Sequence, residues 1–231
     1  MYESTFGLTA PPFQLNPDPT FYFGSRGHSN ALAYLKFGAH QGEGFIVVTG
    51  EVGAGKTTLV RALLAGLDPA KVVAAQVVNT QLQSGELLQS ILAAFGVSPL
   101  GTSKATHIAT LEGFLTALAA KARRARLVGD EAQNLYQEAI EKLRMLSNFQ
   151  FGKQALLQTF LVGQPEFRDI LQHPSMQQLR QRVTATCHIG PLDAEETKGY
   201  IEHRLKCAGS TGRPSFGPGA FEAIHKATGG I

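Results

Sequence analysis

Short apolar segments alternate along the chain with longer segments in which apolar residues recur every three or four positions. The β-branched segment 44–50 (GFIVVTG) predicts a buried strand, and segment 56–67 (KTTLVRALLAGL) predicts a helix. The same patterns predict further strands at 71–78, 126–131, 155–163 and 183–189, further helices at 27–44, 84–97, 105–125 and 136–149, and one or two helices over 166–182. Strands that alternate with helices indicate an α/β fold whose central parallel sheet is covered on both faces.

The two ends of the chain have a different pattern. Residues 1–20 combine prolines with aromatic residues, which predicts an extended, packed arm rather than a helix. Toward the other end, Asp193 and Glu196 predict a capping box for a helix over 194–209, and a second short helix is expected over 217–230. Two helices form a poor core by themselves, so we expect the start of an all-helical second domain in a fragment of a longer protein.

Composition narrows the function classes only slightly. The 231 residues are 43% hydrophobic and carry a formal net charge of +3, which is too mild to imply nucleic-acid binding by itself. Cys187 and Cys207 form neither a disulfide framework nor a metal-ligand spacing, so a reducing, cytoplasmic compartment is expected. The N-terminus lacks the features of a signal peptide, and no apolar run approaches the ~18 residues of a membrane span.

The segment between the first predicted strand and the helix at 56–67 carries the strongest chemical signal. It matches the pattern G-x-x-x-x-G-K-[ST], in the strand–loop–helix context that a phosphate-binding loop requires. Glycines let backbone amides approach phosphate oxygens at a helix N-terminus, the lysine adds a cation at the β- and γ-phosphates, and the threonine hydroxyl ligates Mg²⁺. A plain glycine-rich turn is the alternative. The predicted ATP-binding residues are Gly50, Glu51, Val52, Gly53, Ala54, Gly55, Lys56, Thr57 and Thr58.

Asp130 and Glu131 form an acidic pair at the predicted end of a strand. In a phosphate-loop enzyme, the first carboxylate would hold Mg²⁺ and the second would orient and polarise the attacking water. An ordinary acidic loop end is the alternative. The strand before the pair is also short, because only Leu127, Val128 and Gly129 follow three arginines, and a glycine weakens a central strand.

Four further polar residues lie where predicted strands and helices meet. Gln164 closes one strand; it either senses or positions the water beside the γ-phosphate, or it caps a loop. Arg180 and Arg182 precede another strand; they either complement a helix C-terminus or act as an arginine finger on a neighbouring subunit's γ-phosphate. Asn79 either couples Glu131 to a partner signal or, as we favour, is a turn residue.

Taken in order, these motifs resemble those of one protein family. The N-terminal segment MYESTFGLTAPPFQLNPDPTFYF, the glycine loop, DEAQNL, LVGQPEF, LRQRV and GPLDAEETKGYIEHRL are similar to the ExeA-like AAA+ ATPases, also called general secretion pathway protein A. The resemblance covers essentially the whole chain. It is closest to the branch found beside exosortase and exopolysaccharide-export genes. The wider group of similar proteins includes AAA+ regulators of DNA transposition.

The resemblance implies a P-loop AAA+ fold and assigns roles to individual residues. In this reading, residues 50–57 match the Walker A loop, Asp130 and Glu131 the Walker B acids, Gln164 the sensor-1 position, and Arg180 and Arg182 the box that supplies the arginine finger, with Arg182 preferred. Arg126 and Gly129 depart from the apolar Walker B strand, which affects the expected rate of hydrolysis more than nucleotide binding.

The resemblance also implies that the chain is divided into three parts. An arm at 1–22, including Pro12 and Phe13, would cover the adenine; the ATPase core would span 23–190; and 191–231 would be a truncated helical lid that lacks the family's sensor-2 arginine.

The leading hypothesis is therefore an ATPase that forms a homo-oligomer and binds and hydrolyses ATP with Mg²⁺. The resemblance implies that it energises or assembles a bacterial envelope secretion or exopolysaccharide-export system, in the cytoplasm and at the inner membrane through parts absent from this chain. The alternative is an ATP-dependent DNA-binding regulator, which the mild charge disfavours. A phosphotransferase and a nucleotide-binding module without turnover are also consistent with the phosphate loop.

Overall fold

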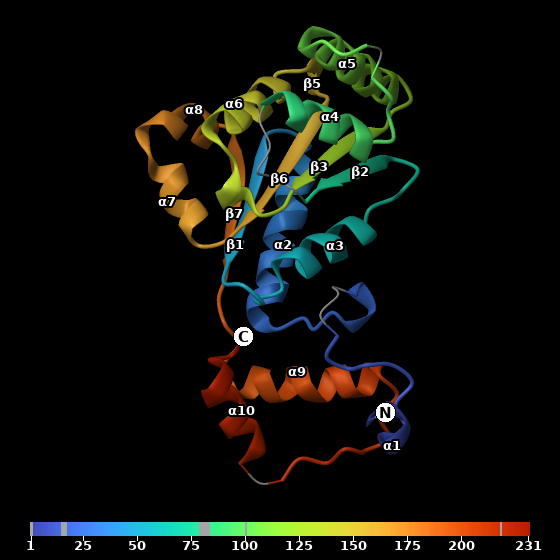
Figure 1. The fold of residues 1–231 in the computed structure, drawn as a ribbon, viewed down its shortest axis with the longest axis vertical. Helices are drawn as coiled ribbons and strands as arrows, with labels where there is room; N and C mark the ends of the chain where they lie inside the picture. The colour runs from blue at the N-terminus through green and yellow to red at the C-terminus, as the bar shows by residue number, and fades with distance from the viewer. Residues whose placement is uncertain (1, 15–17, 79–83, 100, 218) are drawn as a thin grey trace.

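Five parallel strands form the centre of the fold, in the order β2-β3-β6-β1-β7 (Figure 1). The computed structural model describes residues 2–14, 18–78, 84–99, 101–217 and 219–231. The strands of the sheet are β1 (Phe45–Gly50), β2 (Val72–Val77), β3 (Arg124–Gly129), β6 (Leu157–Gly163) and β7 (Val183–Ile189). The α/β fold with a central parallel sheet, predicted from the alternation of strands and helices, is confirmed.

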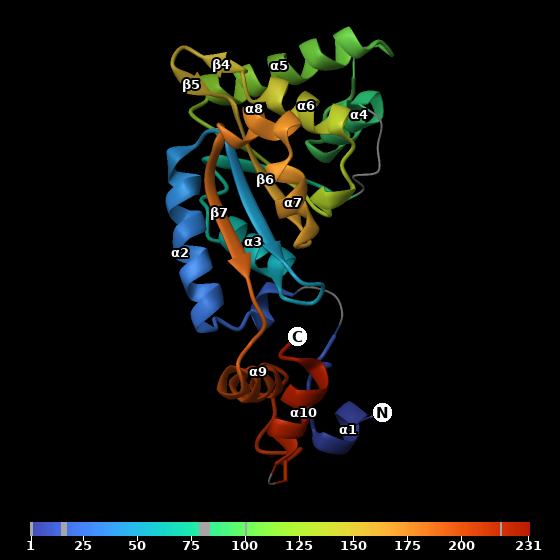
Figure 2. The same cartoon turned by 90° about the vertical axis from the view of Figure 1, so that its left-hand side faces the viewer.

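Helices cover both faces of the sheet because apolar side chains leave the strands on both sides. Helices α2 and α3 pack on one face, where they bury Ile46 and Val48 of β1, whereas α4, α5 and α6 cover the other face with Phe45 and Val47. Figure 2 shows α2 on one side of the strands and α7 on the other. The bounds of these helices are α2 (Arg26–Gln41), α3 (Lys56–Ala65), α4 (Ser84–Ala94), α5 (Lys104–Ala120), α6 (Gln137–Leu146), α7 (Glu166–Gln172) and α8 (Gln177–Arg180).

The parallel arrangement brings the chemical motifs to one edge of the sheet. Gly129 is in register with Leu161 of β6, and Gly163 is in register with Thr49 of β1, so β1, β3 and β6 end close together. The loops that follow these three strands carry the glycine loop, the acidic pair and Gln164. A site at the carboxyl edge of the strands is the usual arrangement in open α/β sheets.

A smaller group of elements contains both ends of the described chain. Figure 1 shows α1, α9 and α10 beyond the end of the sheet that carries the motifs. Leu8, Phe21 and Ala208 form a small apolar cluster there, which joins the N-terminal segment to the C-terminal end of α9. The remaining elements are α1 (Tyr2–Phe6), α9 (Ala194–Cys207), α10 (Ala220–Thr228), three short 3-10 helices (Pro19–Phe21, Ala132–Asn134 and Pro174–Met176), and the antiparallel pair β4 (Gln150–Phe151) and β5 (Gln154–Ala155).

The sequence predicted an extended N-terminal arm without a helix, and this prediction is wrong for the first residues. Residues Tyr2–Phe6 form α1, because the prolines that disfavour a helix begin only at Pro11. Asn79, considered above as a turn residue, lies outside the described residues. No helix among the described residues is long and apolar enough to cross a membrane.

Strand β3 begins two residues earlier than the sequence predicted, at Arg124, and ends at Gly129, before the acidic pair. Arg126 is buried in this strand, and its guanidinium donates a hydrogen bond to the Ala39 carbonyl oxygen at 3.0 Å, near the C-terminal end of α2. Burial and the neighbouring Arg124 lower the pKa of Arg126 to about 10. The Ala39 carbonyl thus gives this buried guanidinium one acceptor, whereas Arg126 Nε has none.

The predicted capping box at the start of α9 is confirmed. The Asp193 carboxylate accepts a hydrogen bond from the Glu196 amide at 2.8 Å, and the Glu196 carboxylate accepts one from the Asp193 amide at 3.2 Å. These bonds satisfy two amides that a helix N-terminus would otherwise leave without an acceptor.

We expect Asp193→Ala to lower the free energy of unfolding by about 1 kcal/mol, because the Glu196 amide loses its acceptor. Urea unfolding followed by circular dichroism measures the change. Lys198→Ala is the matched control, because it removes an exposed ammonium that lies 3.9 Å from Glu202 in the same helix. That variant should stay within about 0.5 kcal/mol of the parent, and equal losses in the two variants would contradict the capping role.

Candidate functional site

The glycine loop joins β1 to α3, and its path requires glycine at two positions. Gly53 and Gly55 have φ values of 86° and 81°, in the left-handed region that side chains disfavour. Gly55 is also the N-cap of α3, so no side chain competes with an anion for the positive end of this helix. The loop therefore has the backbone shape and the polarity of a phosphate site.

The ammonium of Lys56 is buried inside this loop. It donates hydrogen bonds to the carbonyl oxygens of Gly50 at 2.9 Å and Glu51 at 2.8 Å. Burial lowers the pKa of Lys56, while the nearby carboxylates of Glu131 and Asp130 favour its charged form. The lysine thus places a cation beside the loop, on carbonyl partners that phosphate oxygens can replace.

Thr57 and Asp130 meet beside the first turn of α3. The Thr57 hydroxyl donates to Asp130 Oδ2 at 3.0 Å, and Gln76 Nε2 donates to the same oxygen at 3.4 Å. Hydroxyl and carboxylate oxygens are ligands that Mg²⁺ accepts, so the donor set fits this ion. In the described part of the chain, no three side chains of His, Cys, Asp or Glu are placed to hold a metal. Phosphate oxygens and water would have to complete the coordination shell.

Glu131 is held in place by two glutamines. Its carboxylate accepts hydrogen bonds from Gln133 Nε2 at 2.5 Å and from Gln164 Nε2 at 3.3 Å. Gln133 Oε1 also accepts a hydrogen bond from the backbone amide of Gln164 at 3.0 Å. Glu131 itself has a φ of 55°, a conformation that is uncommon for a residue with a side chain. The structure thus brings Gln164 to Glu131 and adds Gln133, which the sequence analysis missed although it lies within DEAQNL.

Arg180 and Arg182 lie away from this edge of the sheet. The Arg180 guanidinium donates to the carbonyl oxygens of Leu171 and His173, at the C-terminal end of α7. The Arg182 guanidinium donates to Ser147 Oγ at 3.1 Å, and the Arg182 carbonyl pairs with the first amide of β1. Because β1 has six residues, Arg182 lies about 20 Å from the glycine loop. Arg182 therefore cannot reach the loop of its own chain.

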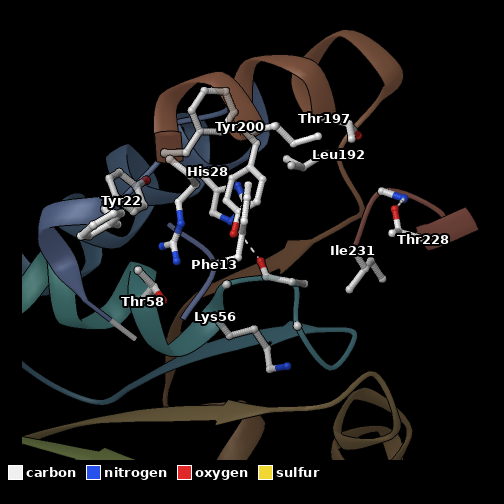
Figure 3. Close-up of a pocket in the computed structure, with 18 of the residues that line it drawn as sticks. Phe13, Tyr22, His28, Lys56, Thr58, Leu192, Thr197, Tyr200, Thr228 and Ile231 are labelled. Carbon is white, nitrogen blue, oxygen red and sulfur yellow. Dashed lines mark hydrogen bonds between the residues drawn. The ribbon is translucent and has the colours of Figure 1, made fainter. Parts of the chain in front are cut away.

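A cavity of about 680 Å³ extends from the glycine loop to α9 (Figure 3). One wall is polar and includes Lys56, Thr57 and Glu131, whereas the opposite wall is largely apolar and includes Phe13 and Tyr200. Of the residues predicted to bind ATP, those that line the cavity are Phe13, Val52, Gly53, Ala54, Gly55, Lys56, Thr57 and Thr58. The others, Pro12, Gly50 and Glu51, do not line it.

His28, which the sequence analysis did not single out, supports the glycine loop from α2. Its Nε2 lies 3.0 Å from the Ala54 carbonyl oxygen, and its Nδ1 lies 2.8 Å from Ser25 Oγ. Because the carbonyl can only accept, Nε2 carries the proton and the neutral ring accepts from the Ser25 hydroxyl. Burial lowers the pKa of His28, which favours this neutral form.

Comparisons with known proteins agree with this arrangement. Residues 39–171 match a family of AAA domains. The whole chain is 38% identical to general secretion pathway protein A of Aeromonas hydrophila over 233 residues and spans 42% of that protein's length.

Similar folds occur among solved structures. The ADP form of the Aeropyrum pernix ORC2 protein has a TM-score of 0.64 and 17% identity, over 84% of this chain and 55% of that one. Cdc6p from Pyrobaculum aerophilum has a TM-score of 0.62 and 17% identity, over 82% of this chain and 53% of that one. Likeness at this low identity shows a shared fold and nothing further.

We expect acidification to destabilise the fold through His28. Burial holds the pKa of His28 below its ordinary 6.5 in the folded chain, so below pH 6.5 the unfolded chain binds this proton first. The free energy of unfolding therefore falls from pH 6.5 toward the lower folded-state pKa, by at most about 1.4 kcal/mol per pH unit. Urea unfolding from about pH 7.5 to about pH 5 measures this slope.

His28→Gln isolates the contribution of this residue, because glutamine keeps a donor and an acceptor but does not titrate in this range. The variant should show a shallower pH dependence than the parent. His40→Gln is the matched control, because His40 is exposed on the same helix. Identical slopes for the parent and His28→Gln would show that His28 does not resist protonation.

Proposed function

Because the chain belongs to the AAA-domain ATPases related to general secretion pathway protein A, we propose that it binds ATP between the glycine loop and α9 and hydrolyses it. One observation carries this proposal: the Thr57–Asp130 hydrogen bond joins the glycine loop to the acidic pair at a single edge of the sheet. A phosphate loop alone is consistent with many reactions, whereas a phosphate loop joined to a metal-binding carboxylate and a second carboxylate favours transfer of a phosphoryl group to water.

Each residue of this edge has a distinct task in the proposed reaction. Lys56 exchanges its loop carbonyls for oxygens of the β- and γ-phosphates. Thr57 and Asp130 would hold Mg²⁺, and the bound ion would neutralise charge on the phosphates. Glu131 orients the attacking water and accepts its proton, and Gln164 keeps this carboxylate in position.

The walls of the cavity support the proposed division of the chain. We assign residues 1–22 to an arm, 23–190 to the ATPase core and 191–231 to part of a helical lid. Phe13 of the arm, Lys56 of the core and Tyr200 of the lid all line the same cavity. A nucleotide in the cavity would therefore contact all three parts.

The biological role is proposed from the relative. That protein's name places it in the general secretion pathway, and this chain spans less than half of its length. We infer that ATP hydrolysis by this chain drives assembly or operation of a bacterial envelope export system, from the cytoplasmic side of the inner membrane. The narrower assignment to exopolysaccharide export is supported by sequence resemblance alone.

Glu131→Gln tests the proposed water-activating role. We expect turnover to fall at least about 100-fold, because the amide cannot accept a proton, while ATP affinity stays within about twofold. Phosphate release measures turnover, and titration with a fluorescent ATP analogue measures binding. Glu138→Gln is the control, because Glu138 is an exposed carboxylate in the next helix. Normal hydrolysis by Glu131→Gln would rule out the role.

Mixing two inactive variants tests the arginine finger. Arg182 lies too far from its own glycine loop to act there, so we propose that it completes the site of a neighbouring subunit. Lys56→Ala should not bind ATP but keeps Arg182, whereas Arg182→Ala keeps the ATP site and lacks the finger. A mixture should recover turnover that neither variant shows alone. Activity that stays at the sum of the two separate variants would contradict a finger in trans.

A further inference from the structure

We propose that Arg204 is a positioning residue that shapes the part of the cavity that receives the base of the nucleotide. This inference rests on the proposed function, because it concerns the end of ATP opposite the phosphates. Arg204 belongs to α9, whereas the backbone that it holds belongs to the N-terminal segment. The residue thus joins two of the walls between which a nucleotide would lie.

The charge of Arg204 is directed at backbone carbonyls of the N-terminal segment. The side chain is only 7% exposed. Its Nε donates a hydrogen bond to the Pro12 carbonyl oxygen, and its Nη2 donates to the Gln14 carbonyl oxygen at 3.5 Å. The ion pairs found among the described residues do not include Arg204. Two backbone carbonyls thus accept hydrogen bonds from this buried guanidinium, and the Asp18 carboxylate adds an electrostatic interaction with it.

The guanidinium also packs against two aromatic rings. Its Cζ lies 4.7 Å from the centroid of the Phe21 ring and 5.8 Å from that of Tyr200. A planar cation at these distances is attracted to ring faces and limits their movement. Arg204, Phe21 and Tyr200 all line the cavity.

These contacts place Phe13 where a flat ligand can meet it. Phe13 stands between the two residues whose carbonyls Arg204 holds, and its ring lies 6.5 Å from that of Tyr200. Figure 3 shows Phe13 and Tyr200 between α9 and the glycine loop. With the triphosphate at Lys56 and Thr57, the heterocyclic base of ATP would extend toward these rings. Aromatic side chains suit a planar base.

The N-terminal segment is attached to α9 at a second place. An effect of Arg204 on base binding can therefore be distinguished from an effect on attachment of the arm. The Thr9 amide and hydroxyl both donate to the Ala208 carbonyl oxygen, at 2.8 and 3.1 Å. Thr9 and Ala208 do not line the cavity. The arm therefore keeps a contact with α9 when the guanidinium of Arg204 is removed, so loss of Arg204 should affect base binding more than attachment of the arm.

Binding of two ligands in the presence of Mg²⁺ tests the inference. ATP would contact both ends of the cavity, whereas inorganic tripolyphosphate has no base and would contact only the end at the glycine loop. Arg204→Met keeps the length of the side chain but lacks the guanidinium. We expect it to bind ATP about tenfold or more weakly than the parent, with tripolyphosphate affinity within about twofold. Arg204→Lys should also be weak for ATP, because an ammonium cannot reproduce the planar, forked contacts.

Lys206→Ala is the matched control, because it removes an exposed cation from the same turn of α9. It should bind both ligands as the parent does. Unchanged ATP affinity in Arg204→Met, or equal losses for ATP and tripolyphosphate, would overturn the positioning role. Retained tripolyphosphate binding also shows that the variant is folded at the glycine loop. A parent chain that binds neither ligand would instead refute the proposed ATP site itself, and this inference with it.

Discussion

The hydrogen bonds of the buried Lys56 ammonium are the interaction on which the site depends. A charged group removed from water needs hydrogen-bond partners, and the carbonyls of Gly50 and Glu51 provide them. Gly53 and Gly55 give the same loop the turn that places those carbonyls around the ammonium. Since Lys56 is also the first residue of α3, the cation and the positive end of the helix lie together. Both favour a polyphosphate at this place.

Neighbouring elements hold this loop in place by hydrogen bonds. His28 contacts its backbone from α2, and Asp130 contacts Thr57 from the end of β3. Glu131 is fixed in turn by amides from two different loops. Groups restrained in this way lose less conformational freedom on binding, so less of the binding free energy is spent on ordering them, whereas Lys56 exchanges its carbonyl partners for phosphate oxygens.

The sequence was sufficient to predict structure and chemistry that depend on residues close together along the chain. The strand, the glycine loop and the first turn of α3 follow from local pattern, as does the capping box at Asp193. It was insufficient where the partner lies far along the chain. Arg126 is accommodated in a strand by the carbonyl of Ala39, 87 residues away, and Arg204 by that of Pro12, 192 residues away. No periodicity in the sequence indicates such contacts. The helix α1 was also missed, because the arm was predicted from its prolines, and these begin only at Pro11.

The attachment of the N-terminal segment to α9 has a consequence for the newly synthesised chain. Thr9 finds its partner at Ala208, 199 residues later. Since synthesis proceeds from the N-terminus, β1 and the glycine loop leave the ribosome well before α9. During that interval the first residues have no surface to dock on, and their apolar side chains, Leu8 among them, remain accessible to chaperones. The aromatic side of the cavity is thus the last part of the site to be completed.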